Sequence, residues 1–302
     1  RCRAMIELGV LIKRNCKLFF KDKGMFITSL ITPIILLVLY ATFLAKVYRD
    51  SFASAMPEGF SVPEALINGT VGGQLISSLL AVSCVTVAFC TNLLMVQDKA
   101  TGARNDLTMA PVKHSTLALS YFAASAVATL IINFTALTVC LIYLGATGWY
   151  LTAAHVLLLI LDVTLLVLFG TALSSVINFP LSTNGQGSAV GTIISAGYGF
   201  ICGAYMPISA FSDGLQRVIS FLPGTYGTSL LRNHALAGVY REMSAEGFPT
   251  EVVEGIKDSI DCNLYFFGNK VEIGTMYLIL VGATILLIGV YILMNRLKQA
   301  KK

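Results

Sequence analysis

Charged side chains are scarce in this sequence. Only 12% of its 302 residues are Asp, Glu, Lys or Arg, whereas a soluble domain carries about 25%. Hydrophobic residues make up 56% of the chain. Because so few charged groups are available to cover a solvated surface, the composition excludes a soluble enzyme.

The sequence also lacks the short motifs of nucleotide and metal chemistry. It has no G-x-x-x-x-G-K-[ST] loop, no H-E-x-x-H pair and no Cys and His group with metal-ligand spacing. The three histidines, His114, His155 and His234, are far apart in sequence. We therefore expect no catalytic or metal-binding residue in this chain and no nucleic-acid partner. The enzymatic alternative is an intramembrane enzyme with Asp162 or His155 as its acid or base.

Long uncharged stretches dominate the chain instead. Five of them, with 22, 33, 48, 50 and 23 residues, lie at 24–45, 65–97, 114–161, 163–212 and 273–295. A helix needs about 20 residues to cross a bilayer. The two longest stretches have room for about two spans each, or one span and part of another, so we count six. Ten-residue segments of alternating polarity are missing, which argues against a transmembrane barrel.

The sequence thus predicts an all-α polytopic membrane protein, with an N-terminal helix at 1–24 and one six-span domain at 25–302. The fifth span follows an uncharged turn at 178–184 and ends near Met206. The other spans are predicted at about Met25–Ala45, Val71–Val96, Leu117–Leu144, Leu151–Ile177 and Ile273–Met294.

Basic residues concentrate on one side of these spans. With the N-terminus inside, the inner segments hold 14 Lys and Arg against 4 acids, and the outer segments hold 7 against 11. Lys and Arg are enriched in cytoplasmic loops of membrane proteins. We therefore expect a multi-pass protein of the cell membrane with both termini in the cytoplasm.

The cysteine pattern does not favour a disulfide framework. Of seven cysteines, only Cys262 falls in a predicted outer segment. A single outer cysteine cannot form an intrachain bridge there, so a free thiol and an intermolecular bond between protomers both stay open.

Residues 3–21 have the pattern of a basic amphipathic helix. At about 100° per residue, the charged side chains share one arc and mainly apolar side chains share the opposite arc. The charged arc holds Arg3, Glu7, Lys13, Arg14, Lys17 and Lys21. A basic amphipathic helix joined directly to a span is typical of one that lies in the inner headgroup layer. The alternative is a juxtamembrane retention signal without a mechanical role.

The predicted inner loop at 97–115 has room for a short helix between Gly102 and Pro111. It carries charges of both signs together with the apolar residues Leu107 and Met109. A short charged helix with apolar tips between two spans is a plausible protein-docking element. A solvated loop without such a role is the alternative.

Asp162 lies inside the predicted fourth span. A charged carboxylate at the bilayer centre costs roughly 2.5 to 3.5 kcal/mol on insertion scales, so this side chain should face protein or water. One hypothesis is a proton or cation relay. The other is a protonated or hydrogen-bonded packing residue, since no second acid lies within a span.

Small residues are frequent in the predicted second and fifth spans. The second span is rich in Gly, Ser, Thr and Ala and has Asn92 near its inner end. The fifth has two G-x-x-x-G patterns, formed by Gly187 with Gly191 and by Gly199 with Gly203. Such residues suit close helix contact or the lining of a pathway.

The region 207–240 predicts a helical hairpin that enters the membrane from outside. Its two moderately apolar pieces, 211–221 and 227–237, are each too short to cross and are separated by the sequence Leu-Pro-Gly-Thr-Tyr at 222–226. Backbone at that depth must be shielded by protein or by a wet cavity. Arg217 and Arg232 should reach the outer water or a protein partner. A polar outer loop is expected at 241–270.

These features together resemble the membrane subunit of type 2 ATP-binding-cassette (ABC) exporters. The resemblance rests on the amphipathic start, the six spans, the charged loop from Asp98 to Val112 and the Phe-Leu-Pro-Gly-Thr-Tyr sequence at 221–226, continuing to Leu231-Arg232. It covers essentially the whole chain. Members usually carry a Glu near the start of this loop and a Gly-Thr pair; here Asp98 replaces the Glu and Thr101-Gly102 is reversed.

The resemblance implies a permease that pairs with a second protomer, as a homodimer or heterodimer, and is driven by two separate ATPase subunits that hold ATP and Mg. An ATPase domain fused upstream of Arg1 is the alternative. Residues 3–21 would be the connecting helix. The coupling set would be Asp98, Lys99, Gly102, Arg104, Asp106, Leu107 and Pro111. Asn92, Gly187, Gly191, Gly199 and Gly203 would line the path or the dimer contact, and Pro207, Leu222, Pro223, Tyr226 and Arg232 would form the outer gate.

The character of the predicted path favours an amphipathic or apolar cargo. Its residues are mostly Ser, Thr, Gly and aliphatic, without a cluster of charge. A drug, lipid or hydrophobic peptide fits such a lining better than a polyanionic glycan, although export of a lipid-linked glycan stays open. The rival class is a secondary transporter or channel that uses Asp162 as its ion site.

Overall fold

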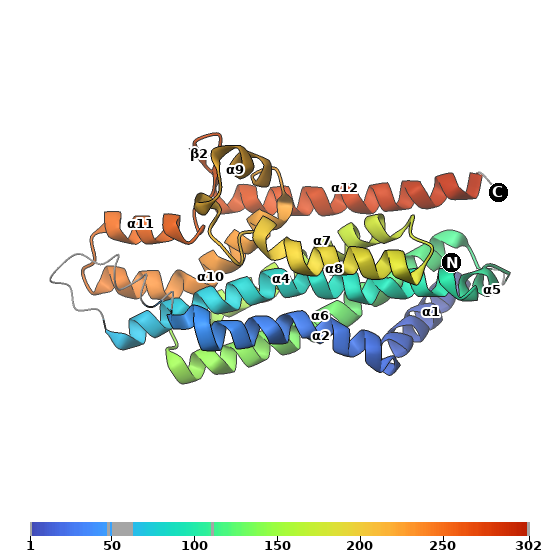
Figure 1. Cartoon of the computed structure of the whole chain (residues 1–302), viewed down its shortest axis with the longest axis horizontal. Coiled ribbons are helices and arrows are strands. Elements are labelled where there is room, and N and C mark those ends of the chain that lie inside the picture. The colour runs from blue at the N-terminus through green and yellow to red at the C-terminus, as the bar shows by residue number, and fades with distance from the viewer. Residues whose placement is uncertain (1, 47–48, 50–62, 110–111, 301–302) are drawn as a thin grey trace.

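The computed structural model describes residues 2–46, 49, 63–109 and 112–300. Figure 1 shows an elongated bundle whose helices run along its long axis, with both termini at one end. We call this the termini end and the other the opposite end. Apart from one hairpin of strands β1 (Tyr265–Phe266) and β2 (Asn269–Lys270), the described chain is helical or irregular.

The helices follow the predicted order along the chain. The long ones are α1 (Cys2–Lys21), α2 (Lys23–Leu39), α4 (Glu64–Ala100), α6 (His114–Thr147), α7 (Ala153–Asn178), α8 (Asn184–Ile201), α10 (Pro223–Ala245) and α12 (Ile273–Ala300). The short ones are α5 (Ala103–Met109), α9 (Asp213–Ile219) and α11 (Thr250–Ser259), with a π-helical turn η1 (Tyr40–Leu44) and a 3-10 turn η2 (Ile208–Ala210).

Four helices in the described chain, α4, α6, α7 and α12, are long and apolar enough to cross a membrane. A fifth span results if α1 and α2, which meet at an angle of 74°, are taken as one broken span. The count of six is therefore not reached by length and composition. The other two predicted spans correspond to α2 and α8, which are not counted as spans on their own. Helix α2 has 17 residues before the π-helical turn, and α8 has 18 residues and begins with the polar sequence Asn-Gly-Gln-Gly-Ser.

The bend after α1 has a local cause. Asp22 lies between the two helices in an extended conformation, and its carboxylate accepts a hydrogen bond from the backbone N–H of Met25 at 3.1 Å. An aspartate in this position caps a new helix. The amphipathic helix therefore ends at Lys21, and α2 begins in a different direction, as the sequence predicts.

Helix α4 is the centre of the bundle. It contacts α2, α6, α7, α8 and α10, and nearly all of its apolar stretch is buried. Small residues permit this crowding. A Cβ at Gly73 would meet the side chain of Leu236 on α10, and at Gly170 on α7 it would lie 3.0 Å from the backbone of α4. Such close approach is the use that small residues have in membrane helices.

Two boundaries differ from the sequence-based prediction. Helix α4 begins seven residues before the predicted Val71 and ends after the predicted Val96, so Asp98 and Lys99 belong to its last turn and not to a loop. Helix α10 has 23 residues, which corrects the prediction of a short piece at 227–237. The polar residues Arg232 and His234 do not end this helix, because both are buried with polar partners.

The region 241–270 is also more structured than the predicted polar loop. It contains the end of α10, then α11 and the β1–β2 hairpin. Val253 and Ile256 of α11 are buried in a small core with Leu236 and Met243 of α10 and with Leu66 at the start of α4. The opposite end of the bundle therefore carries a folded helical cap (Figure 1).

Candidate functional site

Asp98 ties three helices together at the termini end. Its Oδ2 accepts hydrogen bonds from Arg14 Nη1 on α1 and from the Tyr121 hydroxyl on α6, both at 2.6 Å. The carboxylate is nearly buried, with Asp98 6% exposed. Arg14 was placed on the charged arc of the amphipathic helix, and the structure turns it toward the protein. Asp98 therefore holds the amphipathic helix against the bundle.

The rest of α1 packs through a narrow stripe. Leu11, Asn15 and Phe19, spaced by four residues, are buried, and Asn15 donates to Ser120 Oγ at 3.4 Å. Ile6 and Val10 lie within the charged arc of the helix and are 67% and 63% exposed. The helix is thus attached along one face and leaves an exposed apolar edge.

Lys99, the next residue of the predicted coupling set, holds the end of α7. Its ammonium donates to the carbonyl oxygens of Asn178, Phe179 and Leu181 at 3.3, 2.5 and 3.0 Å. A lysine at this position satisfies carbonyl groups that a helix leaves free at its C-terminus. The turn between α7 and α8 is consequently fixed to the last turn of α4.

The exposed part of the predicted coupling loop is α5. None of its residues is buried, and Met109 is 88% exposed. Leu107 is partly buried against the core cluster that contains Leu11, Leu94 and Tyr121. Gly102 precedes α5 with φ of +84°, a conformation in which a side chain would be strained. Arg104 and Asp106 belong to α5, while Pro111 lies outside the described residues.

A large apolar groove runs between α2 and α8, with α4 as its floor. Its volume is about 840 Å³. Helix α2 contributes Ile31, Ile35 and Leu39, and η1 contributes Phe43. Helix α8 contributes the small residues Ser188, Gly191, Thr192 and Ser195. The isoleucine and leucine side chains of this α2 wall are exposed in the part of the protomer that the structure describes.

The structure places the predicted path residues in different surroundings. Gly191 lines the groove, and a Cβ there would meet nothing within 4 Å. Gly187 faces Leu93 of α4, and Gly199 faces Tyr205. Gly203 forms a turn with φ of +73°. Gly187 therefore lies at a close contact between α8 and α4, whereas Gly191 leaves open space beside α8.

Asn92 does not line the groove. Its amide donates to Ser175 Oγ on α7 at 2.9 Å, and the residue is 2% exposed. The neighbouring residues Cys90 and Leu93 line the groove instead. Asn92 thus connects α4 to α7 inside the protomer.

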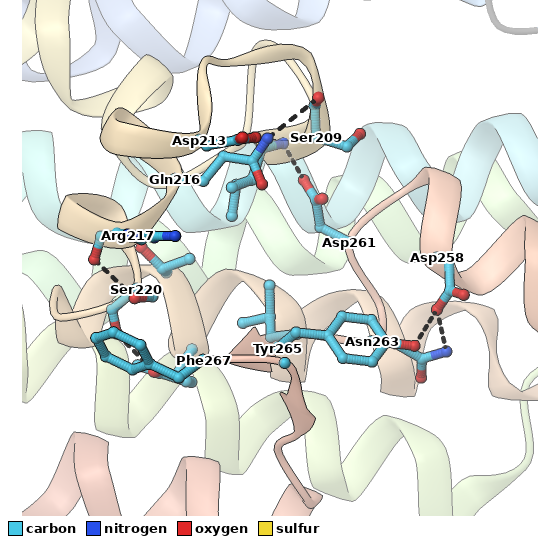
Figure 2. A pocket seen from close by; sticks show the side chains of 15 residues that line it. Ser209, Asp213, Gln216, Arg217, Ser220, Asp258, Asp261, Asn263, Tyr265 and Phe267 are labelled. Carbon is cyan, nitrogen blue, oxygen red and sulfur yellow. Dashed lines mark hydrogen bonds between the residues drawn. The ribbon is translucent and has the colours of Figure 1, made fainter.

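Part of the predicted gate lies next to a polar pocket toward the opposite end. The pocket has a volume of about 530 Å³ and lies between α9 and the segment 258–268 (Figure 2). Tyr226 lines it and donates through its hydroxyl to the Ser220 carbonyl at 2.6 Å. Leu222 precedes α10, and Pro223 occupies its first turn, where the missing N–H has no cost. Pro207 precedes η2.

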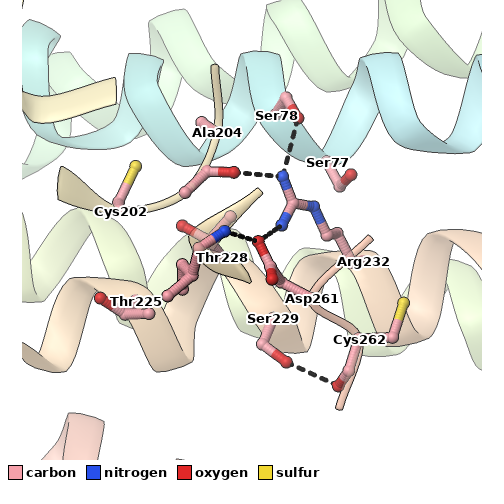
Figure 3. A network of polar contacts seen from close by, with 12 residues as sticks. Ser77, Ser78, Cys202, Ala204, Thr225, Thr228, Ser229, Arg232, Asp261 and Cys262 are labelled. Atoms are coloured by element: carbon pink, nitrogen blue, oxygen red, sulfur yellow. Dashed lines mark hydrogen bonds and ion pairs between the residues drawn. The ribbon is translucent and has the colours of Figure 1, made fainter. Parts of the chain in front are cut away.

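Arg232 is at the centre of a buried polar network (Figure 3). Its Nη1 donates to Asp261 Oδ2 at 3.2 Å, and its Nη2 donates to the Gly203 carbonyl at 2.5 Å and to Ser78 Oγ at 3.4 Å. The same Asp261 oxygen accepts from the Ile208 backbone N–H at 2.8 Å. The network joins α10, α4, the turn after α8 and the segment after α11. The predicted protein partner of Arg232 is therefore Asp261.

Asp162 forms a second buried cluster with residues from two other helices. His234 Nδ1 on α10 is hydrogen-bonded to its Oδ2, and the Tyr277 hydroxyl on α12 donates to its Oδ1, both at 2.5 Å. Asp162 is 1% exposed. The pair with His234 was not predicted from the sequence, although both residues interrupt apolar helices and such residues tend to pair. Asp162 on α7 is thus hydrogen-bonded to side chains from α10 and α12.

A family comparison decides what kind of membrane protein this is. The model of the ABC-2 type transporter matches residues 6–235, most of the chain. The chain belongs to the ABC-2 type transporter family. The matched ABC-2 region begins in α1 and ends in α10, so it includes most of the amphipathic helix, α5, the groove and Arg232, whereas Asp261 lies beyond it. A search of curated protein sequences gave no significant match.

Membership of the ABC-2 family identifies the chain as a membrane permease of a transporter, which confirms the resemblance seen in the sequence.

Proposed function

We propose that the chain is one of two permease protomers of an ATP-driven exporter, and that the α2–α8 groove is its half of the translocation path. The apolar groove carries this proposal. Its α2 wall is exposed in the described part of the protomer, it is lined on α8 by small and hydroxylated residues, and Gly191 leaves room for a neighbouring backbone. A second protomer facing this groove would enclose a mainly apolar path.

The lining favours an amphipathic or apolar cargo such as a drug, a lipid or a hydrophobic peptide. None of the described residues that line the groove is Asp, Glu, Lys or Arg. A polyanionic glycan would find no cation there. In this proposal α2 and α8 complete the six spans, α9 with the start of α10 forms the outer hairpin, and both termini are cytoplasmic, in accordance with the excess of basic residues at that end.

Two separate ATPase subunits, with ATP and Mg, would dock on α5. The exposed Met109 and the half-buried Leu107 supply an apolar contact, and Asp106 supplies a charge. Asp98 and Lys99 would transmit the movement of α5, because they fix the end of α4 to α1 and to the end of α7. Movement at α5 would thus reach two sides of the groove through α4.

The decisive measurement is ATP-dependent uptake of a fluorescent amphipathic amine into inside-out proteoliposomes, with and without the co-purified ATPase. Leu107→Ala with Met109→Ala should abolish transport and leave the spans folded. Leu119→Ala with Ile131→Ala, on the exposed face of α6, is the matched control and should transport normally. Unchanged transport in the α5 variant would refute the coupling role. Transport driven by a proton gradient without ATPase would refute the ABC mechanism and support an ion site at Asp162.

The dimer contact has its own test. Gly191→Cys on α8 should cross-link two protomers with a short bismaleimide, since a side chain fits there. Ile285→Cys on the exposed face of α12 is the control and should not cross-link. The reverse result would place the path on another face of the protein.

A further inference from the structure

The hairpin β1–β2 and α9 form a polar pocket at the boundary of the apolar helices. Residue 270 ends β2, and α12 starts at Ile273, so the hairpin lies directly before a membrane-spanning helix. Phe221, after α9, contacts Phe266 and Phe267 of the hairpin with ring centroids 5.3 and 6.1 Å apart. The two elements are therefore packed together at the start of α12, the level at which we expect the bilayer to end.

The outer surface of these elements is apolar. Val218, Phe221 and Phe267 are 60%, 63% and 65% exposed, and Leu215 is 44% exposed. On elements that lie at a membrane surface, exposed Phe and Leu side chains enter the boundary between lipid headgroups and acyl chains. This surface is accordingly suited to contact with the upper part of lipid acyl chains.

The pocket behind this surface contains charges of both signs (Figure 2). Asp213 and Arg217 belong to α9, one turn apart, so both side chains are on the same side of this helix. Asp258 contributes a second carboxylate, whose Oδ1 accepts from Asn263 at 2.7 Å and from the Tyr265 hydroxyl at 3.0 Å.

These three charges are available to a ligand. Within the described part of the chain, no ion pair involves Asp213, Arg217 or Asp258. Asp261, which also lines the pocket, is already paired with Arg232. The available groups are therefore one guanidinium and two carboxylates in a volume of about 530 Å³, within the range of small-molecule sites.

We propose that this pocket binds a phosphoethanolamine zwitterion, supplied by a lipid of the adjacent leaflet. Arg217 would hold the phosphate, because the guanidinium fork matches the oxygen atoms of a phosphate. Asp213 and Asp258 would receive the ammonium group. The acyl chains would leave over Val218, Phe221 and Phe267. The two carboxylates would repel an anionic headgroup that lacks an amine, so the site would select against phosphatidylglycerol.

The test is native mass spectrometry of the detergent-purified protein with equal amounts of dimyristoyl-phosphatidylethanolamine and dimyristoyl-phosphatidylglycerol. The wild-type chain should retain the ethanolamine lipid preferentially. Arg217→Gln should reduce its affinity about tenfold or more, since a charge-assisted contact is lost. Arg217→Lys should retain a larger part of it. Asp213→Asn with Asp258→Asn should remove the preference over phosphatidylglycerol.

Matched controls separate the pocket from general surface charge. Arg241→Gln and Glu246→Gln change exposed charges at the end of α10 that do not line the pocket, and they should bind like the wild type. Thermal unfolding should be similar for all variants. Equal retention of both lipids by the wild type, or unchanged binding in Arg217→Gln, would overturn the proposal.

The source of the zwitterion is tested by competition. Soluble phosphoethanolamine should displace the lipid only at concentrations far above those of the lipid itself, because it lacks the acyl chains that contact Val218 and Phe267. Equally strong competition would show that the pocket serves a soluble zwitterion, and the lipid assignment would then be wrong. Neither outcome depends on transport, so this experiment tests the lipid site independently of the exporter function.

Discussion

Replacing Arg232 with methionine tests whether the buried network holds the predicted gate in place. Arg232 is 1% exposed and Asp261 is 5% exposed. The change leaves Asp261 with the hydrogen bond from the Ile208 backbone at 2.8 Å but without a cation, and it leaves the Gly203 carbonyl without its guanidinium donor. Breaking a buried ion pair by removing one partner costs about 3–5 kcal/mol, and we expect a loss of unfolding free energy in that range.

The loss should depend on pH in a definite direction. Burial raises the pKa of the Asp261 carboxyl, and Arg232 opposes this effect. Without Arg232 the folded-state pKa should rise further above the unfolded value. The variant should then be destabilised less at low pH, where Asp261 is protonated, and more as the pH rises through the folded pKa. Denaturation with sodium dodecyl sulfate in mixed micelles, followed by circular dichroism at pH 5 and pH 8, measures both effects.

A double-mutant cycle separates the ion pair from general damage. Asp261→Asn alone leaves a buried guanidinium without its counter-charge, whereas Arg232→Met with Asp261→Asn removes both charges. The double variant should therefore lose less than the sum of the two single losses, by about 1 kcal/mol or more. Arg241→Met, an exposed site on the same helix, should change stability by less than about 0.5 kcal/mol. Additive losses, or a single loss no larger than this control, would refute the reasoning.

Three further predictions concern other polar groups. Asp162→Asn should preserve the fold and ATP-driven transport, because an amide oxygen still accepts a hydrogen bond from Tyr277. Asp162→Ala should lower the free energy of unfolding by about 1–3 kcal/mol in the same denaturation assay, because it leaves His234 and Tyr277 without their partner. Loss of transport in Asp162→Asn would contradict the packing role. The Cys262 thiol, whose pKa is raised to about 11 by burial, should react slowly with an impermeant maleimide at pH 7.5, and labelling as fast as that of Arg241→Cys would show that the thiol is not enclosed. Hydrogen bonds from Lys257 and Lys270 lower the pKa of Glu254 to about 2, so protection of α11 in hydrogen exchange should be complete above pH 4.5 and be lost as the pH falls toward 2; Glu254→Gln should abolish this dependence.

The burial of Cys262 also decides between two interpretations of the sequence. The thiol is 1% exposed and hydrogen-bonded to the Tyr240 hydroxyl at 3.2 Å. A bond between protomers would require a sulfur atom at the surface. The structure therefore favours a free thiol over an intermolecular disulfide, a distinction that spacing along the chain could not make.

The amino-acid sequence by itself determined the class of protein and most helix positions. Placing a charge in hydrocarbon costs free energy, and this cost applies to each segment independently of its neighbours. The long uncharged stretches and the basic residues at one end can therefore be recognised segment by segment. The break at Leu222-Pro223 and the bend at Asp22 are also local, because proline and a capping carboxylate act within a few residues.

Only the tertiary structure decided which polar residues face each other. Asp162 and His234 are 72 positions apart, and Arg14 and Asp98 are 84 apart, so no local pattern connects them. Because they have polar partners, Arg232 and His234 are buried inside α10 without ending the helix, and Asp98 is buried as well. From the sequence alone, each of these polar residues would be expected at a surface or at a helix end. The physical reason is that a buried polar group is stable only with a partner, and the partner is supplied by the packing of distant helices.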